Sequence, residues 1–305
     1  MWCIFIHHII NSFNYINKMK KILILMTAVL LVAGCKKKDV MVPVRVHVDD
    51  FTISQEVFPS RDSGPIGDYT GVKAITLAFY TSNGSEQYKV TQMRNDPSSY
   101  TTFGSFSLAL PMGSYTMVVL GYGLNDGEPA ITVTSPTEAS FGSYPARETF
   151  VVTQAVSIAN TEGVELSATL NRVVSKVKVL STDGRTENAH SVRITTSGGS
   201  KAFNPTTGLA TTNSGFGNTV NITTTTVGNI AGPVSYLFLA SDEQTVTVTI
   251  DVLDSEGVSI SHKVVNDVPL KRNRMTKLTG SIFSADGSMA FQVDPDWLSD
   301  NEIPF

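Results

Sequence analysis

Apolar and polar residues alternate along most of this chain, the pattern of β-strands that bury one face and expose the other. In the clearest run, from Val246 to Val252, threonines separate valine and isoleucine residues. A turn at Asp254–Gly257 and a second alternating run, Val258–Val264, complete a predicted β-hairpin. No stretch of about 12 residues carries an apolar stripe at helical spacing. The sequence therefore predicts an all-β fold of antiparallel β-sandwiches and disfavours an α/β arrangement.

The length of 305 residues exceeds what one typical domain needs, so two domains are expected. Residues 155–163 include a polar and small stretch, Ser157 to Gly163, that separates two strand-rich halves. We predict an N-terminal β-sandwich over residues 44–160 and a C-terminal β-sandwich over residues 161–305.

Residues 19–34 have the composition of an export signal, whereas residues 1–17 match no targeting pattern. Met19 is followed by two lysines and then by an apolar run from Ile22 to Ala33. About 12 apolar residues give roughly 18 Å of helix, too short for a hydrocarbon core of about 30 Å. We therefore predict a removed signal peptide over residues 1–34, with translation starting at Met19, followed by a tether over residues 35–43.

The end of this signal, Leu31-Val32-Ala33-Gly34-Cys35, resembles the lipobox of bacterial lipoproteins. The resemblance implies that Cys35 is the lipidation site, carries fatty-acyl chains such as palmitate and becomes the first residue of a mature chain held in the outer membrane. Several tens of buried CH₂ groups, at about 0.8 kcal/mol each, make such an attachment effectively permanent. Lys36 to Lys38 follow directly, and this basic stretch weakens an assignment to the outer face, so the membrane face stays open.

Composition and motifs exclude several classes of function. The formal charge of −4 argues against nucleic-acid partners. No catalytic or phosphate-binding motif occurs, and His47, His190 and His262 are expected to be solvent-facing strand residues. The acidic stretch Asp294–Glu302 lacks the spacing of a calcium loop, and Trp297 is expected to pack against a terminal strand more than to stack on a sugar. We predict no enzyme activity, no metal site and no cofactor.

Several motifs in order along the chain resemble the fimbrillins and fimbrial-anchor lipoproteins of the Bacteroidales, the subunits of type V pili. The likeness spans roughly residues 72–283. Its motifs are an early strand at Tyr69–Tyr80, an "LPxGxY" turn at Leu110–Tyr115, a segment at Leu170–Val177 and an "R-N" signature at Val268–Gly280.

This resemblance implies a transthyretin-like β-sandwich in each half and assembly with other fimbrial subunits by β-strand exchange. In stalk subunits of the family an arginine-specific protease removes the first strand, whereas an anchor keeps its lipid. The length after Cys35 suits an anchor or accessory subunit with a role in adhesion. Arg61 and Arg147 are the exposed-looking candidates for processing, and the sequence does not choose between them. The plainer alternative is that Arg172 and Arg274 are strand-end charges and that Pro111 and Gly113 only make a turn.

A second hypothesis is a monomeric outer-membrane lipoprotein that binds glycans for a polysaccharide-uptake system. Proteins of that class display several exposed aromatic side chains. After Cys35 this chain has one tryptophan, Trp297, so the sequence favours the fimbrial hypothesis.

Overall fold

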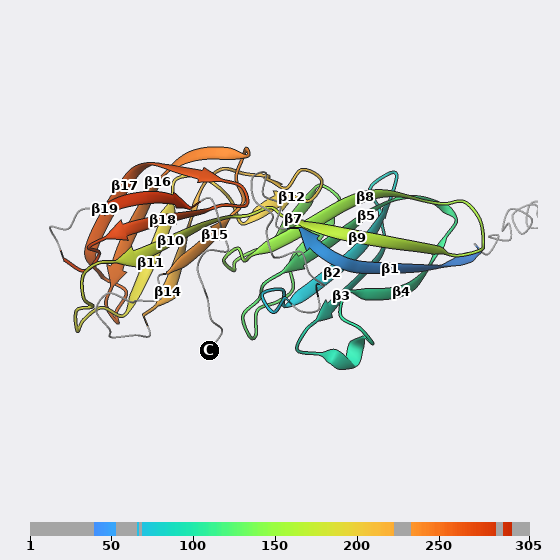
Figure 1. Cartoon of the computed structure of the whole chain (residues 1–305), viewed down its shortest axis with the longest axis horizontal. Coiled ribbons are helices and arrows are strands. Elements are labelled where there is room, and N and C mark those ends of the chain that lie inside the picture. Colours follow the sequence, from blue (N-terminus) through green and yellow to red (C-terminus); the bar gives the residue numbers. More distant parts are fainter. Residues whose placement is uncertain (1–39, 53–65, 67–68, 223–232, 285–288, 295–305) are drawn as a thin grey trace, which may run out of the picture. The chain divides into compact units, whose positions relative to one another are not determined.

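The computed structural model of the chain describes residues 40–52, 66, 69–222, 233–284 and 289–294. Nearly all regular structure in these ranges is β-strand, which confirms the all-β fold class (Figure 1). One short 3-10 helix, η1, lies at Pro97–Ser99. The strands are β1 (Met41–Thr52), β2 (Ala74–Thr81), β3 (Glu86–Met93), β4 (Ser105–Pro111), β5 (Gly113–Tyr122), β6 (Thr132–Ser135), β7 (Glu138–Ser140), β8 (Thr149–Ile158), β9 (Val164–Arg172), β10 (Ser175–Ser181), β11 (Ser191–Thr196), β12 (Ala202–Asn204), β13 (Leu209–Ala210), β14 (Phe216–Asn221), β15 (Val234–Leu237), β16 (Glu243–Leu253), β17 (Ser259–Lys271), β18 (Met275–Gly280) and β19 (Met289–Asp294).

The largest sheet has seven strands in the order β3-β2-β5-β8-β9-β1-β4. Strands β8 and β9 pair only where Phe150 meets Arg172 and Val151 meets Asn171. Side chains from both sides of this short contact share one core cluster, among them Val44 of β1 and Leu77 of β2. The sheet therefore folds back on itself, so that β9, β1 and β4 pack against β3, β2, β5 and β8 as the two layers of a sandwich.

Strands β2 and β5 are buried on both faces, which is unusual for an antiparallel sheet. Leu77 and Phe79 of β2 lie in the core beneath β1, whereas Ala78 and Tyr80 lie in a second cluster on the opposite face. This second cluster also contains Phe203, whose ring stacks on Phe238 with centroids 4.1 Å apart. The small sheet β13-β12-β7-β6 contributes to it, so both halves of the sequence share one apolar core.

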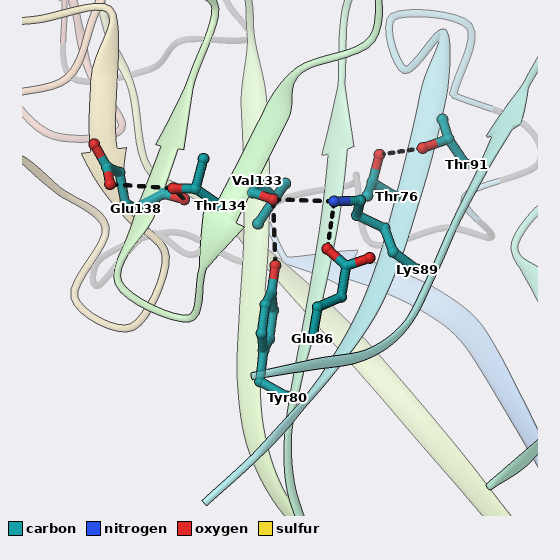
Figure 2. A network of polar contacts seen from close by, with 8 residues as sticks. All are labelled: Thr76, Tyr80, Glu86, Lys89, Thr91, Val133, Thr134 and Glu138. Atoms are coloured by element: carbon teal, nitrogen blue, oxygen red, sulfur yellow. Dashed lines mark hydrogen bonds and ion pairs between the residues drawn. The ribbon is translucent and has the colours of Figure 1, made fainter. Parts of the chain in front are cut away.

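A polar network borders the second cluster (Figure 2). The Tyr80 hydroxyl and the Lys89 ammonium both donate to the carbonyl of Val133 in β6, at 3.4 and 3.3 Å. Lys89 also pairs with Glu86 at 2.5 Å. Burial, with a smaller effect of the Glu86 charge, raises the pKa of Tyr80 to about 12, so this hydroxyl remains a donor at neutral pH. The network fastens β2 and β3 to β6.

The second pair of sheets has the strand orders β15-β10-β18-β19 and β14-β11-β16-β17. A third cluster, with Val177 of β10 and Ile250 of β16 among its members, fills the space between them. The predicted hairpin is confirmed as β16 and β17, which pair in antiparallel orientation. Its turn is held by Asp254, whose carboxylate accepts from the backbone N–H groups of Glu256 and Val258, both at 2.9 Å.

The predicted boundary between the two domains, at residues 160 and 161, stays a prediction. The strand β9 lies on the C-terminal side of this boundary but pairs with a strand on the N-terminal side. Strand β9 lies parallel to β1 within the seven-stranded sheet, with Val44 opposite Val164. Leu170 of β9 is fully buried in the core beneath β1. The polar stretch before β9 is therefore a connection within that sheet.

The two outermost strands of the seven-stranded sheet, β3 and β4, are bridged by one side chain. The buried Gln92 amide accepts from the backbone N–H of Gly104 at 2.8 Å and donates to the carbonyl of Ser105 at 2.7 Å. Gln92 thus links the two edges of the sheet where β4 begins.

Asp183, which follows β10, holds the residues that follow β18. Its carboxylate accepts from three consecutive backbone N–H groups, those of Ile282, Phe283 and Ser284, at 2.8–3.0 Å. Ile282 and Phe283 are buried in the third cluster, so this contact fixes two core side chains. Burial alone would raise the pKa of Asp183, but hydrogen bonds from Ser181, Ser284 and Ile282 outweigh burial and lower it.

We predict that Asp183→Asn lowers the free energy of unfolding by about 1–3 kcal/mol near pH 7, because an amide is a weaker acceptor than a carboxylate bonded to three donors. The native pKa is below the unfolded value of about 3.9, so the carboxylate stabilises the fold fully above that value. Its contribution is lost as the pH falls through the lowered native pKa. Urea unfolding of both proteins between pH 3 and pH 7 measures this; a pH-independent difference would contradict it.

Candidate assembly site

Strand β1 inserts between two strands that lie far from it in the sequence. It pairs with β4 in antiparallel orientation, from Met41 opposite Pro111 to His47 opposite Ser105. On its other side it pairs with β9 in parallel orientation, with a register shift between Val48 and Asp50. Both backbone edges of β1 are thus hydrogen-bonded within the sheet.

The alternation in β1 separates a buried face from an exposed face. Val42, Val44, Val46 and Val48 are between 0% and 5% exposed and belong to the core between the two layers. On the outward face, Arg45 pairs with Glu165 at 3.0 Å and both side chains are more than 60% exposed. The strand is held by apolar burial and backbone pairing, because an exposed ion pair contributes only about 0–1 kcal/mol.

Removing β1 would leave an apolar groove between β4 and β9. Each strand would then present a row of unpaired backbone groups, which is a ready template for another strand. Each buried valine contributes about 1.5–3 kcal/mol, so an empty groove is costly. The site can therefore accept an extended segment with small β-branched residues at alternate positions.

The predicted "LPxGxY" turn joins β4 to β5. The Tyr115 hydroxyl donates to the carbonyl of Pro111 at 2.8 Å, and the Tyr115 ring packs edge-on against Phe79 with centroids 6.3 Å apart. Tyr115 therefore ties the turn to β2. It also fixes the end of β4, whose Pro111 pairs with Met41 at the start of β1.

Residues of three of the recognised motifs meet in a buried polar cluster. Arg172 lies at the end of β9, but its side chain is fully buried and pairs with Glu148 at 2.8 Å. It also donates to the Asn273 side-chain oxygen at 3.3 Å, and Tyr69 donates to Glu148 at 2.6 Å. Burial, and then the Glu148 charge, raise the pKa of Tyr69 well above its usual range. Arg172 is therefore a buried, paired side chain, and not only a charge at a strand end, the alternative that the sequence left open.

A basic hollow of about 560 Å³ lies beside this cluster. Strands β8 and β9 line it together with the turns at 205–208 and 271–274. Its cations are Arg172, Lys271, Arg272 and Arg274, and Asp242 is the carboxylate among its lining residues. Arg272 pairs with Asp242 at 2.8 Å, so this hollow is partly neutralised within the chain.

Of the predicted site residues, the structure describes Arg147. It lies just before β8, its side chain is 19% exposed, and it forms an ion pair with Glu128. The exposure expected from the sequence is therefore not found at Arg147, and both flanking residues, Ala146 and Glu148, are buried. Cys35, Arg61 and the predicted start at Met19 lie outside the described residues.

A cluster on the second sandwich brings an acid, a base and a hydroxyl together. Asp251 accepts from His262 at 2.7 Å, from Arg193 at 3.1 Å and from Ser259 at 3.1 Å. Burial would raise the pKa of Asp251, but these hydrogen bonds lower it. The Ser259 hydroxyl donates to the carboxylate and not to the imidazole. The three side chains therefore do not form the relay in which a histidine activates a serine.

Within the described ranges, no group of three or more His, Cys, Asp or Glu side chains is placed to hold a metal ion. The same part of the chain has no helix of the length and hydropathy needed to cross a bilayer.

Three solved structures align with this chain over most of its length. A Bacteroides ovatus protein inferred to be an adhesin aligns with a TM-score of 0.51 and 11% identity, over 86% of this chain and 95% of its own. The fimbrial anchor protein Mfa2 of Porphyromonas gingivalis has a TM-score of 0.47 and 11% identity, over 84% and 98%. A fimbrial assembly protein of Parabacteroides distasonis has a TM-score of 0.41 and 12% identity, over 84% and 99%.

The structural neighbours are therefore fimbrial anchor, fimbrial assembly and adhesion proteins of the Bacteroidales, and the alignment with the B. ovatus protein shows a shared all-β fold. Residues 71–304 match DUF6562, and the chain belongs to this family of unknown function. No curated protein matches the sequence.

We predict that Val46→Ala in β1 lowers the free energy of unfolding by about 2–3 kcal/mol, because it leaves a cavity in a closely packed core. Arg45→Ala is the matched control on the outward face and should change stability by about 0–1 kcal/mol. Chemical denaturation of the two variants measures the difference. Equal effects would mean that β1 contributes little to the core.

Proposed function

We propose that this protein is a structural subunit of a cell-surface fimbria, anchored in the outer membrane by lipid on Cys35 and assembled by β-strand exchange. The observation that carries the proposal is β1. It is the first described strand, and it begins at Met41, within the last residues of the predicted lipid-bearing tether. It completes a core formed by other strands, and its removal would open a groove for a strand of a partner subunit.

Two further observations support this function. The sequence motifs at Leu110–Tyr115 and at Arg272–Arg274 resemble those of fimbrillins. Tyr115 of the first motif holds the end of β4, which pairs with β1. Asn273 of the second motif accepts from Arg172 in the buried polar cluster. The fold is shared with a B. ovatus protein inferred to be an adhesin, which fits a role in adhesion. In this proposal each pair of facing layers is a transthyretin-like sandwich.

The order of strands favours Arg61 over Arg147 as the processing site. Arg61 lies between the end of β1 at Thr52 and the start of β2 at Ala74, so cleavage there would separate β1 from all other strands. Arg147 precedes β8, and cleavage there would leave β1 connected to β2 through β7. Arg147 is also held by Glu128. Whether the subunit is processed as a stalk or keeps its lipid as an anchor is decided by whether this cut occurs.

We predict that Cys35→Ser abolishes incorporation of an alkyne-labelled palmitate analogue and moves the protein out of the membrane fraction, because acyl chains supply the membrane affinity. Lys36→Ser is the matched control, since it places serine next to Cys35 and keeps the cysteine. It should leave labelling unchanged. Labelling that persists in the Cys35→Ser protein would rule out this anchor.

A disulfide that locks β1 tests strand exchange directly. Arg45 and Ser107 are opposite one another across β1 and β4, and Cα atoms of such pairs lie about 4.5–5.5 Å apart, within disulfide range. We predict that the Arg45→Cys/Ser107→Cys protein, when oxidised, loses the ladder of high-mass species that unboiled membranes of the natural protein give on a detergent gel. Reduction before assembly should restore the ladder.

The control lock lies in the second sandwich, where Thr249 and Val264 are opposite one another across β16 and β17. The Thr249→Cys/Val264→Cys protein should form the ladder in both redox states. A ladder that persists with β1 locked would exclude exchange at β1 but not fimbrial assembly. A single monomer band for the natural protein, before and after boiling, would exclude the polymer, and the glycan-binding alternative would then lead.

A further inference from the structure

The basic hollow beside the buried polar cluster contains a cation that no carboxylate of the described chain neutralises. Three of its four cations each pair with a carboxylate, at 2.6–2.8 Å: Arg172 with Glu148, Lys271 with Glu243 and Arg272 with Asp242. The fourth is Arg274, which is partly buried and donates to the backbone carbonyl of Asn273 at 3.1 Å. Within the described ranges, the Arg274 guanidinium forms no ion pair. The hollow therefore keeps one uncompensated positive charge.

The neighbouring Arg272 is held in a fixed orientation. Its guanidinium donates to the backbone carbonyl of Thr207 at 2.8 Å and pairs with Asp242 at 2.8 Å. Gly208, whose φ is +73°, packs so closely that a Cβ atom there would lie 2.9 Å from Arg272 Nη1. These contacts leave other N–H donors of the guanidinium available to a ligand. A site whose donors are fixed before binding loses less conformational freedom when the ligand binds.

We propose that this hollow binds a sugar that carries one carboxylate group. The planar guanidinium of Arg274 matches a carboxylate, because the two groups can form a pair of parallel N–H···O bonds. One uncompensated charge also suits a carboxylate better than a phosphate monoester, which carries about −1.5 to −2 at pH 7. The volume of about 560 Å³ is within the range of small-molecule sites, about 300–1,000 Å³. This inference goes beyond the proposed assembly and does not depend on it.

The neutral part of the lining suits a sugar ring. Asn171 makes no side-chain hydrogen bond within the part of the chain that the structure describes, so its amide offers donors and an acceptor to sugar hydroxyls. The Thr207 hydroxyl accepts from the backbone N–H of Leu209 at 3.2 Å and keeps its own proton to donate. The apolar residues of the lining are Val151, Val152, Val173 and Pro205. Apolar walls with a few polar groups that fix orientation are typical of small-molecule sites.

Equilibrium dialysis of the full-length protein in detergent tests the site. The probes are galacturonate, glucuronate and N-acetylneuraminate, each a sugar with one carboxylate. Their methyl esters are the matched neutral probes, because they keep the ring and lose the charge. We expect at least one acidic sugar to bind, and its ester to bind about 10-fold more weakly or less, because the ester makes no charge-assisted hydrogen bond. Absence of binding by all three acids, or equal binding of acid and ester, would overturn the inference.

Variants then locate the binding site. Arg274→Gln removes the uncompensated charge and should lower the affinity for the acidic sugar about 10-fold or more. Arg274→Lys keeps the charge without the planar fork and should bind with intermediate affinity. Arg45→Gln is the matched control, since it removes an exposed arginine that does not line the hollow, and it should not change binding. An Arg274→Gln protein that unfolds in urea like the natural protein and binds the sugar equally well would contradict the inference.

A measurement on the natural protein avoids any effect of substitution on folding. Phenylglyoxal modifies accessible arginine side chains, and mass spectrometry of the digested protein gives the rate at each arginine. We expect the acidic sugar to slow the modification of Arg274 several-fold and to leave the rate at Arg45 unchanged. An unchanged rate at Arg274 with saturating sugar would place the sugar elsewhere and overturn the proposed site.

Two further probes separate the sugar from other anions. Inorganic phosphate and N-acetylglycine, which imitates the C-terminal end of a protein chain, are dialysed against the natural protein in the same way. We expect both to bind more weakly than the acidic sugar, because neither carries a ring with hydroxyls that can bond to Asn171 and Thr207. Tighter binding of phosphate would identify a site for phosphate groups, and tighter binding of N-acetylglycine a site for a chain end. Either result would overturn the assignment to a sugar.

Discussion

The structure depends on the burial of β2 and β5 on both faces. One face of these strands meets the valines of β1, and the other meets Phe203, Phe238 and the small sheet that joins the two halves. The two clusters share strands but not side chains. Loss of β1 would therefore remove contacts from the first cluster and leave the side chains of the second in place. In the proposed strand exchange, this separation would leave the second cluster packed while β1 is replaced.

The fold class and the local hairpins could be predicted from the sequence, because period-2 alternation and turn residues are local signals. The hairpin of β16 and β17 is the best example, since Asp254 closes its turn within four residues. The pairing of β9 with β1 could not be predicted, because β1 lies about 120 residues earlier in the chain, as in the contact of Arg45 with Glu165. A parallel pairing over such a distance leaves no mark in the intervening sequence.

The buried polar contacts also could not be predicted from the sequence. Arg172 looks like a solvated charge at a strand end, and only the fold brings Glu148 and Asn273 to it, the latter from 101 residues away. Similarly, Arg147 follows a turn rich in small residues, which suggested exposure, whereas Glu128 from a neighbouring loop pairs with it. The alternation predicted which apolar side chains face inward, but not which charged side chains pair with one another inside the fold.

The amide of Gln92 has a consequence for how copies of this chain can share a crowded surface. Open sheet edges are where separate molecules pair by mistake, and proteins usually protect them with charge, proline or a bulge. Here the amide of Gln92, a side chain 4% exposed, accepts from the N–H of Gly104 and donates to the carbonyl of Ser105, so both backbone groups are hydrogen-bonded within the chain. The sheet thereby behaves at this point like a closed barrel. A molecule built in this way directs intermolecular strand pairing away from the seam between β3 and β4.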